Sequence, residues 1–448
     1  MSLDLAPDLR PLTSIDVLLE GFASAERPAA LAQIGLEHEK LVFPLGEAGP
    51  VAYEGPRGIG ALLAQIERRG YQPFREAPGL PVIALQKGAA TVSLEPGGQF
   101  EFSGSPGRTA SQVHQEHLAH LGDAVAAASE LGLGFATLGY RPFGVPALMP
   151  WMPKSRYGAM KKTLGARGAL ALDMMLMTAT GQVSLDWSSE ADCALKVTAA
   201  SRISPLLIAL FANSPLVNGA ASGFKSYRSH VWTQVDPSRC GLQSFMLDGS
   251  FSYRAYVAWA LEAPLLFLRR NGGYATPPLT FRQLLDKGFE GRPAVQADWV
   301  DHLSTLFPEV RIKRVLEIRS ADCVSVELTA GLAALMRGLL YSPQALEATA
   351  ALLPVRTLPA YDELANVARR QGLSGVWGKR RLAEWAVDLV AIARRGLAAL
   401  GDGDATLLDP LAALAASGRS PADAVLAKWQ EQPSPAALLA ANRLAPPA

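Results

Sequence analysis

The segment TVSLEPGGQFEFSG, residues 91–104, predicts a β-hairpin in which the acidic side chains share one face. Apolar and polar residues alternate on both sides of residues 96–98, as they do in two half-buried strands. If residues 96–98 form the hairpin loop, Glu95 and Glu101 lie on the same face and the opposite face is apolar. The sequence therefore predicts a sheet whose open face is acidic.

A shorter hairpin loop is the alternative. A two-residue loop of Gly97 and Gly98 would place Glu95 and Glu101 on opposite faces of the sheet. One charge would then be buried against Phe100, and burying an unpaired charge costs on the order of several kcal/mol. The three-residue loop is favoured for this reason.

Three other segments repeat this alternation: IGLEHEKLVF (34–43), GQVSLDW (181–187) and VLEIRSAD (315–322). In each segment the polar side chains fall on one face and apolar residues dominate the other. The polar residues that bear on a site are Glu37, Glu39, Gln182, Glu317 and Arg319.

Five acids on strand faces predict a metal site. A single strand glutamate is usually a solvated surface residue. Clustered carboxylates repel one another and have raised pKa values unless cations neutralise them. Hard divalent ions take oxygen ligands, and Mg²⁺ in particular is held by a few carboxylates together with substrate phosphates. The set therefore indicates a nucleotide-metal site.

Composition narrows the class of partner. The 448 residues carry 42 Lys and Arg against 41 Asp and Glu, for a net charge of +1. This balance predicts neither a nucleic-acid partner nor an anionic membrane surface. The longest apolar runs are shorter than a bilayer requires, and the first residues carry acids rather than a basic leader. We therefore expect a soluble, cytoplasmic protein without a membrane partner, either a monomer or a homodimer.

The three cysteines are predicted to be free thiols. Cys193, Cys240 and Cys323 are far apart and form no CxxC pair or metal-ligand spacing. Such cysteines are typical of a reducing compartment and of packing positions.

The chain is expected to have two parts. Residues 1–325 mix strands and helices, whereas residues 326–448 are rich in alanine and leucine. Helix starts with serine followed by proline recur at 342–343, 420–421 and 434–435, because proline at the first helical position loses no hydrogen bond. We expect residues 1–325 to form a catalytic core and residues 326–448 a helical region packed on that same core.

Basic segments supply candidate groups for an anionic substrate. MPKSRYGAMKK (152–162) contains Arg156, and SYRSHVW (226–232) contains Arg228. Arginine binds carboxylates and phosphates through paired donors, although a solvated basic face is the alternative interpretation. No Rossmann, P-loop or nucleophile-elbow motif occurs, so a bound nucleotide requires a different architecture. The histidines of HQEHLAH (114–120) are better explained by packing or surface positions than by zinc.

Long motifs resemble one enzyme family. GLEHEK, SLEPGGQFEFSG, MPKSRYGAM, FKSYRSHVWT and LFPEVRIKRVLEIRSAD, in this order, resemble the plant and proteobacterial type of glutamate-cysteine ligase. The resemblance implies an α+β fold similar to glutamine synthetase. In that fold a curved, mainly antiparallel sheet forms a funnel-shaped active site, with helices outside and a helical C-terminal part.

The resemblance also implies an activity. In the family, ATP phosphorylates the side-chain carboxylate of glutamate, and the amine of cysteine attacks the acyl phosphate to give γ-glutamylcysteine, the first step of glutathione synthesis. ATP and Mg²⁺ are the implied cofactors. After Asp322 this chain reads CVSVELTAGLAALM where the family continues with a glycine-proline-tryptophan segment. This difference leaves open a γ-glutamyl ligase with another amine acceptor; a catalytically silent nucleotide-binding paralogue is a further alternative.

Carried over by motif position, the resemblance assigns roles to individual residues. Arg228 binds the glutamate α-carboxylate, and Arg319 and Lys313 meet the polyphosphate. Glu317, Arg319 and Arg228 are the residues expected to be essential for catalysis. Arg156, Thr180 and Trp232 shape the amino-acid pockets. The implied metal ligands are Glu37, Glu39, Glu95, Glu101, Glu317 and Gln182.

Overall fold

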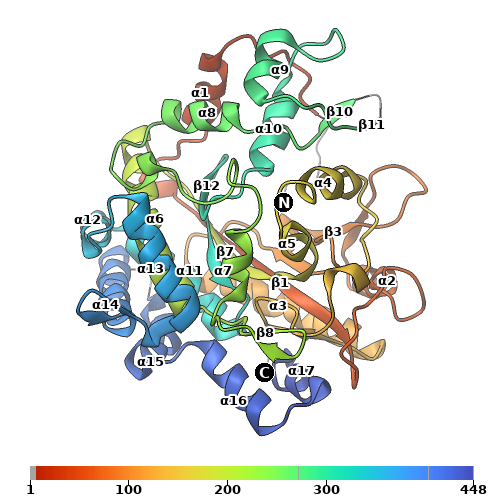
Figure 1. Ribbon diagram of the computed structural model, residues 1–448, viewed down its shortest axis with the longest axis vertical. Helices are drawn as coiled ribbons and strands as arrows, with labels where there is room; N and C mark the ends of the chain where they lie inside the picture. Colours follow the sequence, from red (N-terminus) through yellow and green to blue (C-terminus); the bar gives the residue numbers. More distant parts are fainter. Residues whose placement is uncertain (1–6, 271, 402, 447–448) are drawn as a thin grey trace.

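An open antiparallel sheet lies at the centre of the computed structural model, which describes residues 7–270, 272–401 and 403–446. Among the described residues the strands run in the order β12-β13-β7-β1-β5-β4-β3-β2, and β6 also pairs with β1 (Figure 1). The strands are β1 Ile34–Pro44, β2 Gln72–Phe74, β3 Ala84–Lys87, β4 Ala90–Leu94, β5 Phe100–Ser103, β6 Leu133–Ala136, β7 Thr180–Leu185, β12 Val310–Ile312 and β13 Leu316–Asp322. Short two-stranded ribbons are formed by β8 Leu216–Val217 with β9 Ala220–Ala221, β10 Leu268–Arg270 with β11 Gly273–Ala275, and β14 Val376–Trp377 with β15 Arg380–Arg381.

The three-residue hairpin loop is confirmed. Ser93 pairs with Glu101 in the β4-β5 register, and the Glu95 amide donates to the Gln99 carbonyl at 3.0 Å. The loop closes with the Gly98 amide donating to the Glu95 carbonyl at 2.9 Å, and Gly98 has φ +81°. A left-handed residue at the end of a three-residue loop suits glycine, which has no Cβ to clash.

Helices surround the sheet. They are α1 Ile15–Ala23, α2 Ile59–Glu67, α3 Ala110–Glu130, α4 Arg156–Leu164, α5 Ala171–Met177, α6 Glu190–Leu210, α7 Tyr227–Trp232, α8 Tyr253–Glu262, α9 Phe281–Lys287, α10 Gln296–Ser304, α11 Val326–Tyr341, α12 Pro343–Leu352, α13 Leu358–Gln371, α14 Leu382–Leu400, α15 Asp409–Ser417, α16 Pro421–Glu431 and α17 Pro435–Ala441. Figure 1 shows α11 to α15 gathered on one side of the sheet and α8 to α10 beyond its β12 edge.

One face of the sheet is buried under helices. Phe100 and Phe102 of β5 pack in a cluster with residues of α2 and α3, while Ile34, Val183 and Ile318 pack with α6, α11 and α14. Because β strands alternate, burying these residues turns their acidic neighbours toward the opposite face. Helices α11 to α15 belong to the same core cluster as these strands, and α16 and α17 pack in another cluster that includes β1. The division at residue 325 stays a prediction.

Two polar residues of β1 are buried on the helix-covered face. His38 and Lys40 are each 0% exposed. His38 Nδ1 lies 3.0 Å from His117 Nε2, and Lys40 Nζ donates to the His38 carbonyl at 2.7 Å. His117 and His120 stack on Phe102, so these two histidines are packing residues.

The serine-proline helix starts are confirmed. Proline is the first residue of α12, α16 and α17, with Ser342, Ser420 and Ser434 at the preceding cap positions. Gly70 adopts φ +89° two residues after Arg68, the residue that caps the C-terminus of α2.

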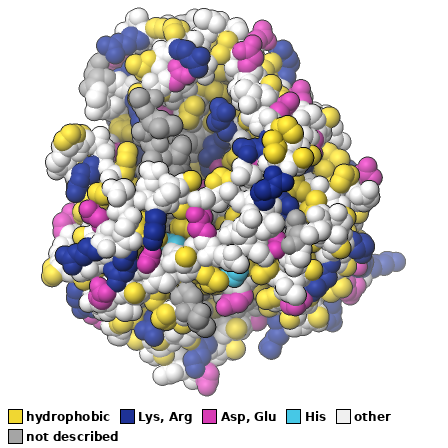
Figure 2. All heavy atoms as spheres, turned by 180° about the vertical axis from the view of Figure 1, so that it is seen from behind, with side chains coloured by type: hydrophobic (Ala, Val, Ile, Leu, Met, Phe, Trp, Pro, Cys, Tyr) yellow, Lys and Arg dark blue, Asp and Glu magenta, His cyan; other side chains and the backbone are white. Residues whose placement is uncertain are grey.

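The surface charge and the most apolar helix relate to the prediction that the protein has no nucleic-acid or membrane partner. Figure 2 shows acidic and basic side chains interspersed over one face of the molecule, in keeping with the small net charge. Among the described residues, α6 alone has the length and composition of a membrane span, but 89% of its apolar window is buried inside the protein. An apolar helix buried to this extent is typical of a protein core.

Candidate active site

A cavity of about 130 Å³ lies against the acidic face of the sheet. Larger hollows of about 450, 800 and 940 Å³ lie elsewhere on the molecule, without a comparable set of converging acids. The nine predicted site residues that line the 130 Å³ cavity are Glu37, Glu39, Glu95, Glu101, Arg156, Gln182, Lys313, Glu317 and Arg319. Residues as far apart in the sequence as Glu37 and Arg319 thus converge at one site.

The strand register explains why these residues meet. Glu39 of β1 stands opposite Glu101 of β5, and Glu37 stands opposite Gln182 of β7. Residues directly opposite in an antiparallel pair share a face and have Cβ atoms about 4.5–5.5 Å apart. Glu95 follows β4 at the hairpin loop and completes the row.

Burial and mutual repulsion make the acids electrostatically costly. Burial raises the pKa of Glu39 well above its ordinary value, and the charges of Glu101 and Glu95 raise it further. Burial and the charge of Glu101 likewise raise the pKa of Glu95, against the opposing effect of Lys154. Groups in this state gain most from an added cation.

Glu317 has a different environment because three cations surround it. Its carboxylate lies 2.5 Å from Arg311 Nε and from Lys313 Nζ, and 3.8 Å from Arg319 Nη1. Burial opposes ionisation, but Arg311, Lys313 and Arg319 together hold the pKa of Glu317 far below its ordinary value. Arg319 also donates to Gln182 Oε1 at 2.6 Å, which links the basic group to the acidic row.

A second, smaller cavity of about 20 Å³ adjoins the first, and both are lined by Arg319 and Phe307. Arg228 and Trp232 of α7 line this annex. Arg228 donates to the Arg319 carbonyl at 3.0 Å and lies 3.9 Å from the Asp322 carboxylate.

Asp322 fixes α7, the helix that carries Arg228. The Asp322 carboxylate accepts hydrogen bonds from Ser214 Oγ at 2.6 Å, Ser226 Oγ at 2.8 Å and the Asn213 amide at 2.8 Å. Ser226 in turn caps α7 by accepting from the Ser229 amide.

Thr180 does not line the acidic cavity or the annex. Its hydroxyl donates to the Ala321 carbonyl at 2.6 Å, while its amide donates to Glu39 Oε2 at 3.1 Å. Thr180 therefore contacts the site through its backbone, by orienting Glu39.

Three further residues belong to the site and were not assigned roles from the sequence. Arg311 stands opposite Glu317 in the β12-β13 register, and a three-residue loop at 313–315 in the sequence would have indicated that pair.

Lys154 is buried near Glu95 and Glu101, and burial lowers its pKa to about 8 although those two acids oppose the shift. Glu309 lines the annex and follows a proline, with no periodic pattern to mark it.

The donor set fits magnesium rather than a metal enclosed by the protein. Among the described residues no three His, Cys, Asp or Glu side chains form a ready-made ligand group. Mg²⁺ is commonly held by one or two carboxylates, with waters and substrate phosphates completing six ligands. Oxygen donors spread along one open cavity match that requirement.

The segment after Asp322 lies on the other side of the sheet. The Val324 carbonyl is 3.2 Å from His38 Nε2, and Val326 begins α11. Residues 323–341 are absent from the described linings of both cavities. The difference between this segment and the family's glycine-proline-tryptophan segment therefore affects the helix-covered side of the sheet rather than the acidic cavity.

Comparisons with known proteins agree with this geometry. The family model for glutamate-cysteine ligase family 2 (GCS2) matches residues 33–439. The chain belongs to glutamate-cysteine ligase family 2. The chloroplastic glutamate-cysteine ligase of Medicago truncatula is 38% identical over 429 residues, covering 94% of this chain and 84% of the relative. The chloroplastic enzyme of Arabidopsis thaliana is 38% identical over 420 residues, covering 93% of this chain and 80% of the relative.

Solved structures support the fold of this family member. The glutamate-cysteine ligase of Francisella tularensis, solved in complex with AMP, has a TM-score of 0.56 and 12% identity, covering 92% of this chain and 87% of that one. The fold predicted from the sequence, a glutamine-synthetase-like antiparallel sheet with outer helices, is thereby confirmed. The chain is a ligase, and its family acts in glutathione synthesis.

One prediction requires correction. The cytoplasmic location expected from the sequence is wrong by these comparisons, because the curated relatives are named chloroplastic enzymes. The expectation depended on the charge of the first dozen residues, and such a short segment does not determine where an enzyme acts.

Proposed function

We propose that this chain catalyses the ATP- and Mg²⁺-dependent ligation of the glutamate γ-carboxylate to the amine of cysteine, giving γ-glutamylcysteine. A γ-carboxylate oxygen of glutamate attacks the terminal phosphorus of ATP, and the bond to ADP breaks. The cysteine amine then attacks the acyl carbon of γ-glutamyl phosphate, and phosphate leaves. The convergence of five strand glutamates with four cationic side chains in one cavity carries this proposal.

The acidic row would hold the metal. Glu37, Glu39, Glu95, Glu101, Glu317 and Gln182 offer the oxygen ligands. When bound, Mg²⁺ neutralises phosphate charge and orients the transferred group. Glu317 lies at the boundary between these acids and the basic group, where it orients Arg319 and Lys313.

The basic group would bind the polyphosphate. Lys313 and Arg319 line the cavity, and Arg311 stands beside them. Phosphoryl transfer depends mainly on positioning and charge neutralisation, so cations fixed in advance are the main requirement. No nucleophilic side chain is needed in this scheme.

The amino-acid substrates would occupy the space between the two cavities. Arg228 would bind the α-carboxylate of glutamate in the annex, with Trp232 as a wall, while Arg156 lies at the acidic end. Thr180 would act by holding Glu39. Since Arg319 lines both cavities, Arg319 would contact the middle of a glutamate substrate that extends from one cavity into the other.

An ADP-release assay tests this function. The purified chain should release ADP only when Mg²⁺, glutamate and cysteine are all present, and mass spectrometry should detect γ-glutamylcysteine. If other amines support faster release than cysteine, the enzyme is a γ-glutamyl ligase with a different acceptor. If calorimetry shows ATP binding but no product forms, the chain is a silent paralogue. A monomeric or homodimeric state and the absence of membrane or nucleic-acid partners stay predictions.

A further inference from the structure

The annex contains unpartnered polar atoms from three elements of the fold. Four buried atoms that line it have no hydrogen-bond partner: Arg228 Nε, Trp232 Nε1, Ser320 Oγ and Glu309 Oε2. A buried polar atom left unpaired costs about 1–3 kcal/mol, so such a cluster indicates a missing partner. Its location beside the acidic cavity makes a substrate group the natural candidate.

The chemistry of these atoms is complementary to an α-amino acid. The guanidinium and indole groups donate, the serine hydroxyl can donate or accept, and the Glu309 carboxylate accepts. An amino-acid head group carries one carboxylate and one ammonium, which require donors and acceptors side by side. The annex volume of about 20 Å³ accommodates one water-sized group, and an ammonium has that size, so the rest of the head group would extend past Arg319 into the adjoining cavity.

Glu309 has no ion-pair partner of its own within the described protein. Tyr361 and Arg369 of α13 are polar neighbours of Glu309, Tyr361 through its hydroxyl and Arg369 through its charge, yet Glu309 Oε2, Tyr361 Oη and Arg369 Nε complete no hydrogen bond of full geometry. Burial raises the pKa of Glu309, although Arg369 and Tyr361 oppose the shift. The contact with α13 therefore leaves Glu309 Oε2 available to a further donor.

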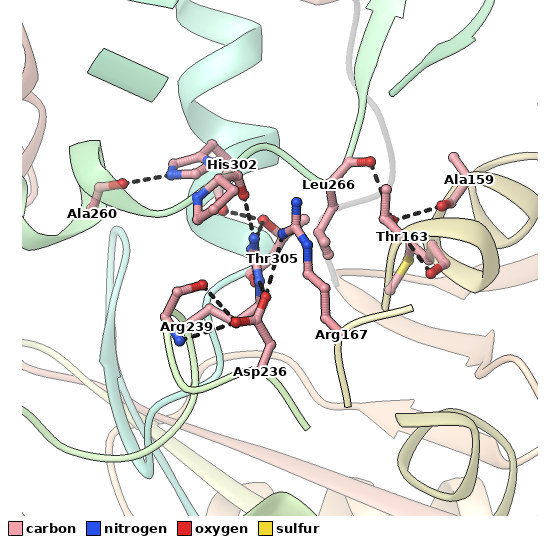
Figure 3. Close-up of polar contacts among 12 residues, drawn as sticks. Ala159, Thr163, Arg167, Asp236, Arg239, Ala260, Leu266, His302 and Thr305 are labelled. Atoms are coloured by element: carbon pink, nitrogen blue, oxygen red, sulfur yellow. Dashed lines mark hydrogen bonds and ion pairs between the residues drawn. The ribbon is translucent and has the colours of Figure 1, made fainter. Parts of the chain in front are cut away.

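The segment that carries Glu309 is rigidly held. Buried Arg239 donates to Asp236 at 2.9 Å and to the Thr305 carbonyl at 3.0 Å, and its own carbonyl accepts from the Phe307 amide at 2.7 Å. Figure 3 shows Asp236 between Arg239 and Arg167, with Thr305 against Arg239. In addition, the Glu309 carbonyl accepts from the Arg319 amide at 3.0 Å. Glu309 is therefore positioned before any substrate enters.

We propose that Glu309 is the residue that recognises the α-ammonium group of glutamate, opposite the α-carboxylate held by Arg228. This inference rests on the proposed function, which places glutamate in this site. With Glu309 in this role, the annex would select α-amino dicarboxylic acids over dicarboxylic acids that lack the amino group. Glutarate, which is glutamate without the α-amino group, would bind without using Glu309.

The test compares glutamate with glutarate in the full chain. Glu309→Gln keeps the side-chain shape and removes the charge; Asp362→Asn removes an exposed charge near Arg369 and serves as the control. In Glu309→Gln the KM for glutamate should rise about tenfold to hundredfold, the effect of one hydrogen bond to a charged group. The KM for glutarate should be unchanged, so the preference for glutamate collapses. Asp362→Asn should retain the wild-type preference.

Two results would overturn the proposal. One is an unchanged glutamate KM in Glu309→Gln, and the other is an equal loss for glutamate and glutarate, which would indicate a structural role. If wild type releases no ADP, the proposed function fails separately, and calorimetry then decides the inference. Weaker binding of glutamate, but not glutarate, to Glu309→Gln would support it, whereas equal binding to both proteins, or no binding to wild type, would contradict it.

Discussion

Glu39 of β1 and Glu101 of β5 stand directly opposite each other on the cavity-facing side of the sheet. Like charges in this position destabilise a sheet, because the two side chains are neighbours in the ladder. The arrangement is useful only if a cation joins the two carboxylates. The stability of the metal-free protein should therefore be improved by removing one of them.

Glu39→Gln tests this effect through pH. The raised pKa of Glu39 means that its carboxyl favours folding below the ordinary pKa of about 4.3 and loses that contribution as the pH rises through the folded value. Without Mg²⁺ at pH 8, the variant should have a free energy of unfolding higher than wild type by up to about 1 kcal/mol. Urea titrations at pH 5 and pH 8 measure the difference, which should be smaller at pH 5. A variant less stable than wild type at pH 8 without Mg²⁺ would show that Glu39 is not strained.

Glu317→Gln should have the opposite effect on stability. It leaves Arg311, Lys313 and Arg319 without their buried partner, which should destabilise the protein by about 3–5 kcal/mol. The depressed pKa of Glu317 means that its contribution is present above the ordinary pKa and is lost as the pH falls.

ADP release by the same variant tests the catalytic role of Glu317. Turnover at a temperature where Glu317→Gln is folded should fall at least about a hundredfold, the size expected for one lost electrostatic contact in a transition state. Glu317→Ala should abolish turnover. Arg314→Gln, which alters an exposed neighbour outside the cavity lining, is the matched control and should retain wild-type turnover. Unchanged ADP release in Glu317→Gln would remove this residue from the mechanism.

Gly97→Ala should disturb the hairpin that presents Glu95. A Cβ at Gly97 would lie 2.3 Å from the Leu176 carbonyl oxygen, so the loop must move away from α5. We expect a loss of stability of about 1–3 kcal/mol, as for overpacking, together with reduced turnover. Gly88→Ala, in the β3-β4 turn at φ +63° with open space around it, should destabilise through backbone strain but leave turnover unchanged. Equal turnover in both variants would show that the loop does not position the site.

The thiols should be unreactive in the folded protein. Cys193, Cys240 and Cys323 are buried and free, and burial raises the pKa of Cys240 to about 12. Ellman's reagent should modify them only after denaturation, and turnover should not differ between oxidising and reducing buffers. Rapid labelling of native protein with loss of activity would instead indicate a redox-sensitive site.

Side-chain alternation predicted the acidic face because a strand that buries one face must expose the other. The pattern around Glu95 and Glu101 even specified the loop length, since the alternative buried a charge. Alternation could not show that Lys40 is buried. Lys40 lies at a position of β1 that faces the helices, where the pattern leads one to expect an apolar residue. Glu309 escaped notice because the annex forms only where α7 and β13 meet the start of β12 in three dimensions.

An anomalous diffraction map from crystals grown with Mn²⁺ and ADP would show whether the strand carboxylates bind the catalytic metal. Manganese favours the same oxygen ligands as magnesium. We expect anomalous peaks in the acidic cavity, in direct coordination with carboxylates of Glu39, Glu95 or Glu101 and with phosphate oxygens. Peaks confined to surface carboxylates, with ADP bound and the acidic cavity free of metal, would contradict this expectation.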